Sequence, residues 1–208
     1  MKKATIATLA LVLVLAASTF ASAANYIGGG IGIIPSDPAG DTLVGKLPAF
    51  TFALDYDVMD KLSISANGYV KVVEELDAVS VTPTPAAKYG ANYLVGGYVK
   101  YALANLDALK LGAVVGANYD SKLLDADADA DFNYGAGVFV EQPLGDTGTI
   151  FGQAMYWVKP TGANPVVKEH IGGLGGINFR ITDKIAVKGQ VEYLKQKALF
   201  SIGVGYAF

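Results

Sequence analysis

The segment KALFSIGVGYAF, at positions 197–208, is the part of the sequence that decides the fold class. In an extended chain, every second residue faces the same side. One face of this segment is large and apolar, and it consists of Phe200, Ile202, Val204, Tyr206 and Phe208. The opposite face is mostly small, with Ser201, two glycines and Ala207. A strand of this kind needs an apolar environment on its bulky face.

The N-terminal residues 1–23 have the pattern of a secretory signal peptide. Lys2 and Lys3 precede an apolar run, and Ala21-Ser22-Ala23 matches a cleavage site. The apolar run over 9–17 is too short to cross about 30 Å of hydrocarbon, so a transmembrane helix is not expected there. We therefore predict one mature domain, residues 24–208.

The composition excludes several classes of protein. Without Lys2 and Lys3, 14 basic residues stand against 19 acidic ones, a net charge of −5 that makes nucleic acid an unexpected partner. The absence of cysteine from the sequence excludes disulfides and a lipid-modified cysteine. Yet 52% of the residues are hydrophobic and 25 are glycine, without a membrane-spanning helical segment. A transmembrane β-barrel accounts for this combination.

Ten segments alternate with a period of two residues, as strands do. They are 26–34, 49–57, 61–72, 88–101, 108–119, 131–141, 149–158, 170–181, 185–194 and 198–208. Short and long connections alternate between them, except that the ninth is also short. Outer-membrane barrels have short turns in the periplasm and longer loops outside. The sequence thus predicts an all-β, antiparallel up-and-down barrel with both termini in the periplasm.

One face of every segment carries only Ala, Gly, Val, Ile, Leu, Phe or Tyr, although 17% of the residues are charged. A Lys or Arg facing the middle of a bilayer costs about 2–4 kcal/mol, so lipid contact explains this exclusion. A soluble β-sandwich or a lipocalin-like barrel is the alternative, but its outward face would be polar.

With these features, the sequence resembles the small outer-membrane β-barrel proteins of Gram-negative bacteria, the porin-like and opacity-type superfamily. The resemblance covers the whole mature chain. It implies that the last strand, with Tyr206 and the terminal aromatic Phe208, is recognised by the barrel-assembly machinery. The commonest small members have eight strands, so eight is the alternative to the ten counted here.

The inward faces carry more basic than acidic residues. The inward charges are Asp55, Lys71, Lys88, Lys100, Lys110, Glu141, Arg180, Lys188 and Glu192. Because unpaired charges are costly in a dry interior, the surplus of cations indicates water inside. Bulky inward residues on the third to seventh strands would face glycines on the first, eighth and last. This arrangement fits either a plugged barrel or a narrow passage along the glycine wall.

The stretch LDADADADF places Asp125, Asp127, Asp129 and Asp131 at alternate positions. It does not form an EF-hand, because Ala130 and Ala136 replace the turn glycine and the bidentate glutamate. We expect a solvated extracellular acidic loop there and no defined metal site, with weak binding of divalent ions as the alternative. The four acids would form a row at the mouth of the barrel that favours cations. Lys122 is the one basic residue expected to oppose it.

The expected function follows from these features. The single histidine, His170, has no catalytic constellation in the sequence, so neither an enzyme nor a cofactor is expected. The leading hypothesis is a narrow porin-like channel for small solutes or ions in the bacterial outer membrane. The alternative is a plugged structural or adhesin-like barrel. The expected partners are membrane lipid, lipopolysaccharide and, during biogenesis, the barrel-assembly machinery.

Overall fold

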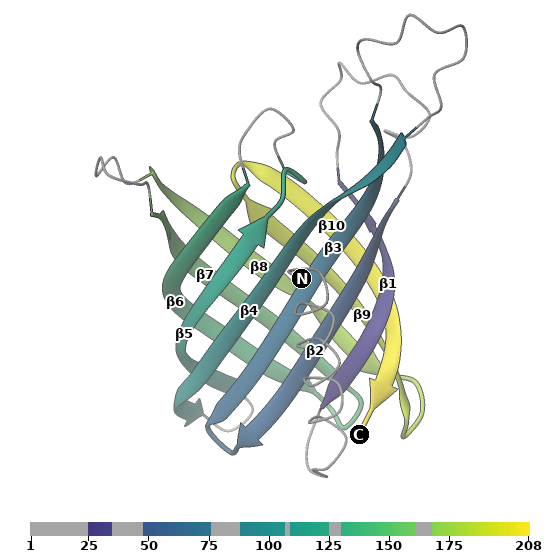
Figure 1. Ribbon diagram of the computed structural model, residues 1–208. Coiled ribbons are helices and arrows are strands. Elements are labelled where there is room, and N and C mark those ends of the chain that lie inside the picture. Colours follow the sequence, from purple (N-terminus) through teal and green to yellow (C-terminus); the bar gives the residue numbers. More distant parts are fainter. Residues whose placement is uncertain (1–24, 35–47, 76–87, 107–108, 125–129, 161–167) are drawn as a thin grey trace, which may run out of the picture.

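The computed structural model describes residues 25–34, 48–75, 88–106, 109–124, 130–160 and 168–208. These residues form ten strands that close into a single antiparallel barrel, in which β1 pairs with both β2 and β10 (Figure 1). The strands are β1 (Tyr26–Ile33), β2 (Ala49–Met59), β3 (Leu62–Glu75), β4 (Lys88–Leu106), β5 (Leu109–Asp120), β6 (Asp131–Leu144), β7 (Gly148–Lys159), β8 (Lys168–Arg180), β9 (Ile185–Leu194) and β10 (Lys197–Ala207). The prediction of ten strands rather than eight is confirmed. The expected signal peptide, residues 1–23, lies outside the described residues.

The barrel has two unlike ends. At the end where Tyr26 pairs with Ala207, which we call the terminal end, the connections are short, as at 60–61, 145–147 and 181–184. At the opposite end, which we call the loop end, β5 and β6 are separated by residues 121–130, whereas residues 195–196 alone join β9 to β10. The alternation of connections, including the short ninth one, is as predicted.

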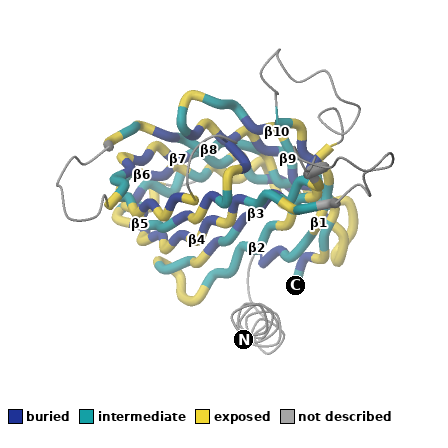
Figure 2. The backbone as a smooth tube through the Cα atoms, turned by 45° about the horizontal axis from the view of Figure 1, so that its top comes forward, coloured by how far each residue is buried: buried dark blue, intermediate teal, exposed yellow. Residues whose placement is uncertain are grey.

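The exposed and buried faces have the predicted phase on all ten strands. Buried and exposed residues alternate along the barrel wall (Figure 2). Five exposed large hydrophobic residues lie beyond the ends of the predicted segments, namely Val58, Met59, Leu103, Leu106 and Leu144. Every other exposed large hydrophobic residue lies on a face that the sequence assigns to the exterior. Ile171 is 71% exposed and Phe50 is 65% exposed, which would be costly in water. Among the residues that the structure describes, no helix is long and apolar enough to cross a membrane.

The core of the molecule lies inside the barrel. One cluster of buried side chains comes from the barrel wall and from the connection after β5; it comprises Ala49, Tyr69, Leu94, Tyr98, Ala102, Val114, Leu123, Leu124, Phe139, Met155, Trp157, Leu194 and Leu199. Its members come from strands on all sides of the barrel, so their contacts hold the wall together across the lumen.

Candidate functional site

Aromatic side chains lie against the glycines of the inner wall. A Cβ atom added at Gly172 would lie 2.8 Å from Nε1 of Trp157, and one added at Gly176 would lie 2.7 Å from the Phe151 ring. On β10, a Cβ at Gly205 would lie 2.6 Å from the Tyr26 ring. Such distances are below any ordinary contact, so each glycine makes room for a ring on a neighbouring strand. The expected glycine wall exists, but aromatic rings cover it.

The aromatic covering continues on the other side of the barrel. Tyr98 lies over Gly96 and Gly116, and Phe139 lies over Gly112. The rings of Tyr98 and Trp157 meet edge to face, with their centroids 6.2 Å apart. Rings therefore cover inward glycines on their own or a neighbouring strand, an arrangement that agrees with the plugged alternative.

Buried Glu192, on β9, ties three strands together through the interior. Its Oε2 accepts a hydrogen bond from Nδ2 of Asn67 at 2.9 Å, and its Oε1 accepts one from the Tyr98 hydroxyl at 3.2 Å. Nearby, Nε2 of Gln190 donates to the Tyr69 hydroxyl at 3.3 Å. The donors to Glu192 come from β3 and β4, so this network spans the barrel instead of following a single ladder.

Two inward lysines are paired with carboxylates near the terminal end. Nζ of Lys100 lies 2.9 Å from Oε1 of Glu141, and Nζ of Lys188 lies 2.5 Å from Oδ2 of Asp55. Lys188 also lies over the Phe151 ring, 4.9 Å from its centroid. Lys110 lies opposite Glu141 in the β5–β6 register, at the level that the sequence predicts. Of the remaining inward charges in the prediction, Lys71 lies near the loop end of β3 and Arg180 near the terminal end of β8; the Lys88 side chain lies outside what the structure describes.

A polar cavity of about 190 Å³ opens among these charges at the terminal end. It is lined by Lys100, Lys110, Glu141 and other polar residues. Ser65 Oγ and Asn178 Oδ1 border it and have no hydrogen-bond partner among the described residues. A water molecule occupies about 30 Å³ of liquid, so the cavity has room for several. Its size and lining agree with the expectation of water inside the barrel, at this end.

At the loop end, the beginning of the β5–β6 connection packs into the interior of the barrel. After Asp120, the chain turns inward, and Leu123 and Leu124 join the core of the barrel. Oδ1 of Asp120 accepts hydrogen bonds from the backbone N of Leu123 at 2.7 Å and of Leu124 at 3.4 Å. Ser121 Oγ accepts a further bond from the backbone N of Tyr93 on β4. We call residues 120–124 the cap.

Lysines bind the cap and the first residue of β6. Nζ of Lys195, in the β9–β10 turn, lies 2.9 Å from Oδ2 of Asp120 and 2.9 Å from Oδ2 of Asp131. Lys159, the last residue of β7, also pairs with Asp131. Burial opposes the charge of Lys195, but the hydrogen bonds to Asp131 and Asp120 outweigh it and raise the pKa of its ammonium group.

Asp131 is the one residue of the expected acidic row that the structure describes. Asp125, Asp127 and Asp129 lie outside the described residues. Asp131 lies at the mouth, as predicted, but Lys159 and Lys195 bind it. The expectation that Lys122 alone opposes these acids was wrong for Asp131, because strand pairing brings cations from distant parts of the sequence to it.

Sequence reasoning missed Asp120, Lys159 and Lys195 as members of this site. The predicted fifth and seventh strands end at 119 and 158, one residue before Asp120 and Lys159. Both have the inward parity of their strands, so extending the alternation by one residue would have found them. Lys195 lies in a turn and has no such signal in the sequence.

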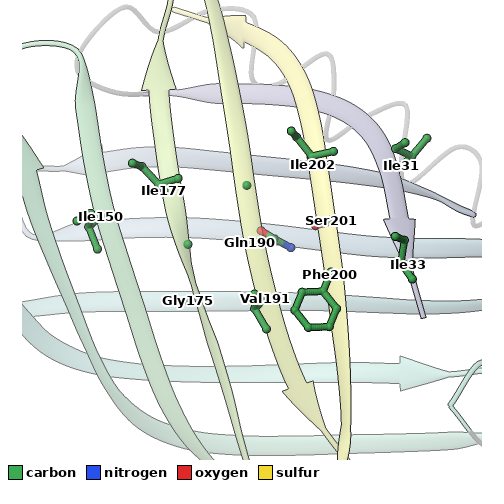
Figure 3. A pocket seen from close by; sticks show the side chains of 12 residues that line it. Ile31, Ile33, Ile150, Gly175, Ile177, Gln190, Val191, Phe200, Ser201 and Ile202 are labelled. Atoms are coloured by element: carbon green, nitrogen blue, oxygen red, sulfur yellow. The ribbon is translucent and has the colours of Figure 1, made fainter. Parts of the chain in front are cut away.

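The outer wall contains a shallow apolar groove of about 600 Å³ over β7 to β10 and β1. Figure 3 shows its apolar side chains distributed across these strands, namely Ile31, Ile33, Ile150, Ile177, Val191, Phe200 and Ile202. Gly175 and Gly189 form its floor, and an added Cβ would meet its nearest atom at 3.6 Å and 3.9 Å, respectively. Unlike the inner glycines, these are not required by packing.

The expected assembly residues lie at the terminal end of the barrel seam. The rings of Tyr206 and Phe208 are stacked, with centroids 6.1 Å apart, and Tyr206 is 48% exposed on the outer wall. The backbone N of Phe208 donates to the carbonyl oxygen of Asn25 at 3.1 Å. These two residues therefore sit where the first and last strands close the barrel.

Among the described residues, no group of three or more His, Cys, Asp or Glu side chains is placed to hold a metal ion. His170 lies on the inward face of β8, opposite Trp157 in the β7–β8 register.

Comparisons with known proteins give structural likenesses only. No family model and no curated protein matches the sequence. The outer-membrane protease OmpT from Escherichia coli is 12% identical, with 88% of this chain and 94% of that chain covered and a TM-score of 0.42. Ail, the attachment invasion locus protein of Yersinia pestis, is 12% identical, with coverages of 89% and 97% and a TM-score of 0.39. The translocator domain of the autotransporter NalP from Neisseria meningitidis is 13% identical, with coverages of 100% and 98% and a TM-score of 0.39.

The class of this protein follows from its own geometry. It is a closed antiparallel β-barrel of ten strands, with an apolar exterior and an interior of aromatic rings, paired charges and a capped mouth.

Proposed function

We propose that this protein is an integral β-barrel of the bacterial outer membrane whose interior is closed to solutes, with a structural or surface-interaction role. The observation that carries the proposal is the aromatic covering of the inner glycines, since Trp157, Phe151 and Tyr26 occupy the space that these small residues would otherwise leave along the wall. The Lys100–Glu141 pair lies toward the terminal end of this aromatic layer, and the cap lies at the loop end. Both occupy space in the interior of the barrel. No enzymatic activity and no cofactor are part of the proposal.

The membrane location is supported by the outer face. Large apolar side chains are exposed on every strand of the wall, and this pattern suits contact with lipid and lipopolysaccharide. The connections at the terminal end are short, as periplasmic turns of outer-membrane barrels are, and this supports the proposal that Asn25 and Phe208 lie on the periplasmic side. Tyr206 and Phe208 are proposed as the residues that the barrel-assembly machinery recognises.

A narrow channel for small solutes or ions is the second candidate. The cavity of about 190 Å³ favours it, because a hydrated, charge-lined vestibule is the first part of any polar pathway. In this candidate, the aromatic layer would have to rearrange for conduction.

Conductance of the purified protein in planar lipid bilayers separates the two candidates. A closed barrel gives no unitary conductance, and stable conductance of the unaltered protein would overturn the closed barrel in favour of the channel. Trp157→Ala tests the cause of closure, with the outward neighbour Tyr156→Ala as its control, since Trp157 is 2% exposed and Tyr156 is 47% exposed. We expect conductance to appear or increase in Trp157→Ala and not in Tyr156→Ala.

A further inference from the structure

Backbone strain is concentrated at the loop end of the barrel. Among the described residues, the non-glycine residues with positive φ are Lys122 at 88°, Lys195 at 48° and Gln196 at 64°. Lys122 belongs to the cap, and the other two form the β9–β10 turn that reaches it. Strained backbone persists only where surrounding contacts hold it, and it gathers at switching elements.

The β9–β10 turn is built against local preference. A two-residue hairpin with positive φ at both positions favours Asn-Gly or Asp-Gly, and here the residues are Lys and Gln. An Asn or Gly would ease the backbone at position 195. It would also remove the ammonium group that joins Asp120 to Asp131. The ion pairs with Asp120 and Asp131 therefore offset the backbone strain of a lysine at position 195.

Lys195 joins three separate elements at one point. It extends from the β9–β10 turn, Asp120 ends β5 and begins the cap, and Asp131 begins β6. Asp120 also holds the cap's own backbone at Leu123 and Leu124. The same carboxylate thus shapes the cap and anchors it to Lys195, so loss of the Lys195 contact acts on the cap directly.

The apolar side chains of the cap depend on this anchorage. Leu124 is 1% exposed and packs with the barrel core, although it follows a strained residue in a connection at the mouth. Release of the cap would expose the apolar Leu124 side chain to water, and this cost disfavours release. Release would also relax the backbone at Lys122, and this gain favours it. The two arrangements therefore balance opposing contributions, as a switching element requires.

We propose that Lys195 is the latch of a releasable cap, and that loss of its bonds to Asp120 and Asp131 frees residues 121–124 from the mouth while the barrel, with Asp120 at the end of β5, stays folded. This inference rests on the proposed closed barrel, because it names the element that closes the loop end. It adds a second state of the mouth, in which the core beneath the cap is open to the outside.

Thiol labelling tests the latch directly, because the natural sequence has no cysteine. Leu124→Cys supplies a single buried thiol, and Ala130→Cys, at an exposed position, gives the rate for a free one. The proteins are folded into lipid vesicles and treated with a membrane-impermeant maleimide. We expect Lys195→Met to speed labelling of Leu124→Cys at least tenfold, toward the Ala130→Cys rate, and Lys195→Arg to restore slow labelling.

Matched variants separate the latch from general damage to the turn. Gln196→Gly eases the same turn without altering the ion pairs, so labelling should stay slow. If Leu124→Cys does not give a heat-modifiable barrel, Leu123→Cys, at a position only 9% exposed, replaces it. The latch is overturned if the buried cysteine is labelled equally fast with and without the Lys195→Met change. Conductance of the unaltered protein would instead overturn the closed barrel, so the two failures are distinct.

Discussion

At the scale of single residues, glycines in the barrel wall differ in how much space surrounds them. Inward glycines such as Gly137 would place a Cβ against backbone or ring atoms, whereas the outward Gly97 would meet nothing within 4 Å. A small residue is thus a packing requirement at the inward Gly137 and only a local choice at the outward Gly97. This difference cannot be read from the residue type, since both are glycines in strands.

The two glycines give a paired prediction. Gly137→Ala would drive its Cβ to 2.8 Å from the Cα of Met155, a backbone atom that cannot move aside, so it should lose about 1–3 kcal/mol of stability. Gly97→Ala should be neutral or gain about 0.4–1 kcal/mol, because it restricts the unfolded chain without a clash. Urea unfolding of both variants in lipid vesicles measures the difference. Similar stabilities would mean that the inner wall is looser than described.

At the scale of elements, the strands are joined through the lumen as well as along their edges. Glu192 on β9 receives hydrogen bonds from Asn67 on β3 and Tyr98 on β4, which are not its sheet neighbours. Cross-barrel bonds of this kind resist changes in the shape of the barrel, because moving one strand breaks contacts on the opposite wall.

Glu192→Leu should therefore destabilise the barrel more than Glu192→Gln. The leucine leaves the Asn67 amide and the Tyr98 hydroxyl without an acceptor, and each buried unpaired group costs about 1–3 kcal/mol. The glutamine retains one acceptor oxygen in the same place and should lose less. The midpoint of urea unfolding is the measurement. A leucine variant as stable as the unaltered protein would show that the network contributes nothing.

At the scale of the whole molecule, the apolar exterior is the property that suits contact with membrane lipid. Val115 is 54% exposed on the outer face of β5, while Thr149 faces the polar cavity on the inner face of β7. Both positions are in strands, and they differ in which side of the wall they occupy.

Val115→Lys should cost about 2–4 kcal/mol in lipid vesicles, because its ammonium group would face hydrocarbon. Thr149→Lys should cost less, since it would join the carboxylates of Asp57 and Glu141 around the cavity. Folding titrations of the two variants in the same vesicles compare these losses. Equal losses would contradict a lipid-facing exterior at Val115.

The strands, their number and the face that each turns outward follow from the amino-acid sequence alone. They do so because alternation with a period of two is a local property, and because contact with lipid disfavours charged residues on that face. The same alternation placed Asp55, Lys100, Glu141, Lys188 and Glu192 on the inner face, where the structure has them.

Which inner groups meet depends on the tertiary structure. Lys195 and Asp120 are 75 positions apart, and their ion pair arises from the register of five neighbouring strands and the direction of a two-residue turn. The same is true of the rings over the glycines, because side-chain rotamers are chosen by packing against residues on neighbouring strands. Parity along a strand tells which wall a side chain faces, but closure of the barrel sets its partners, and those partners decide whether the lumen is filled.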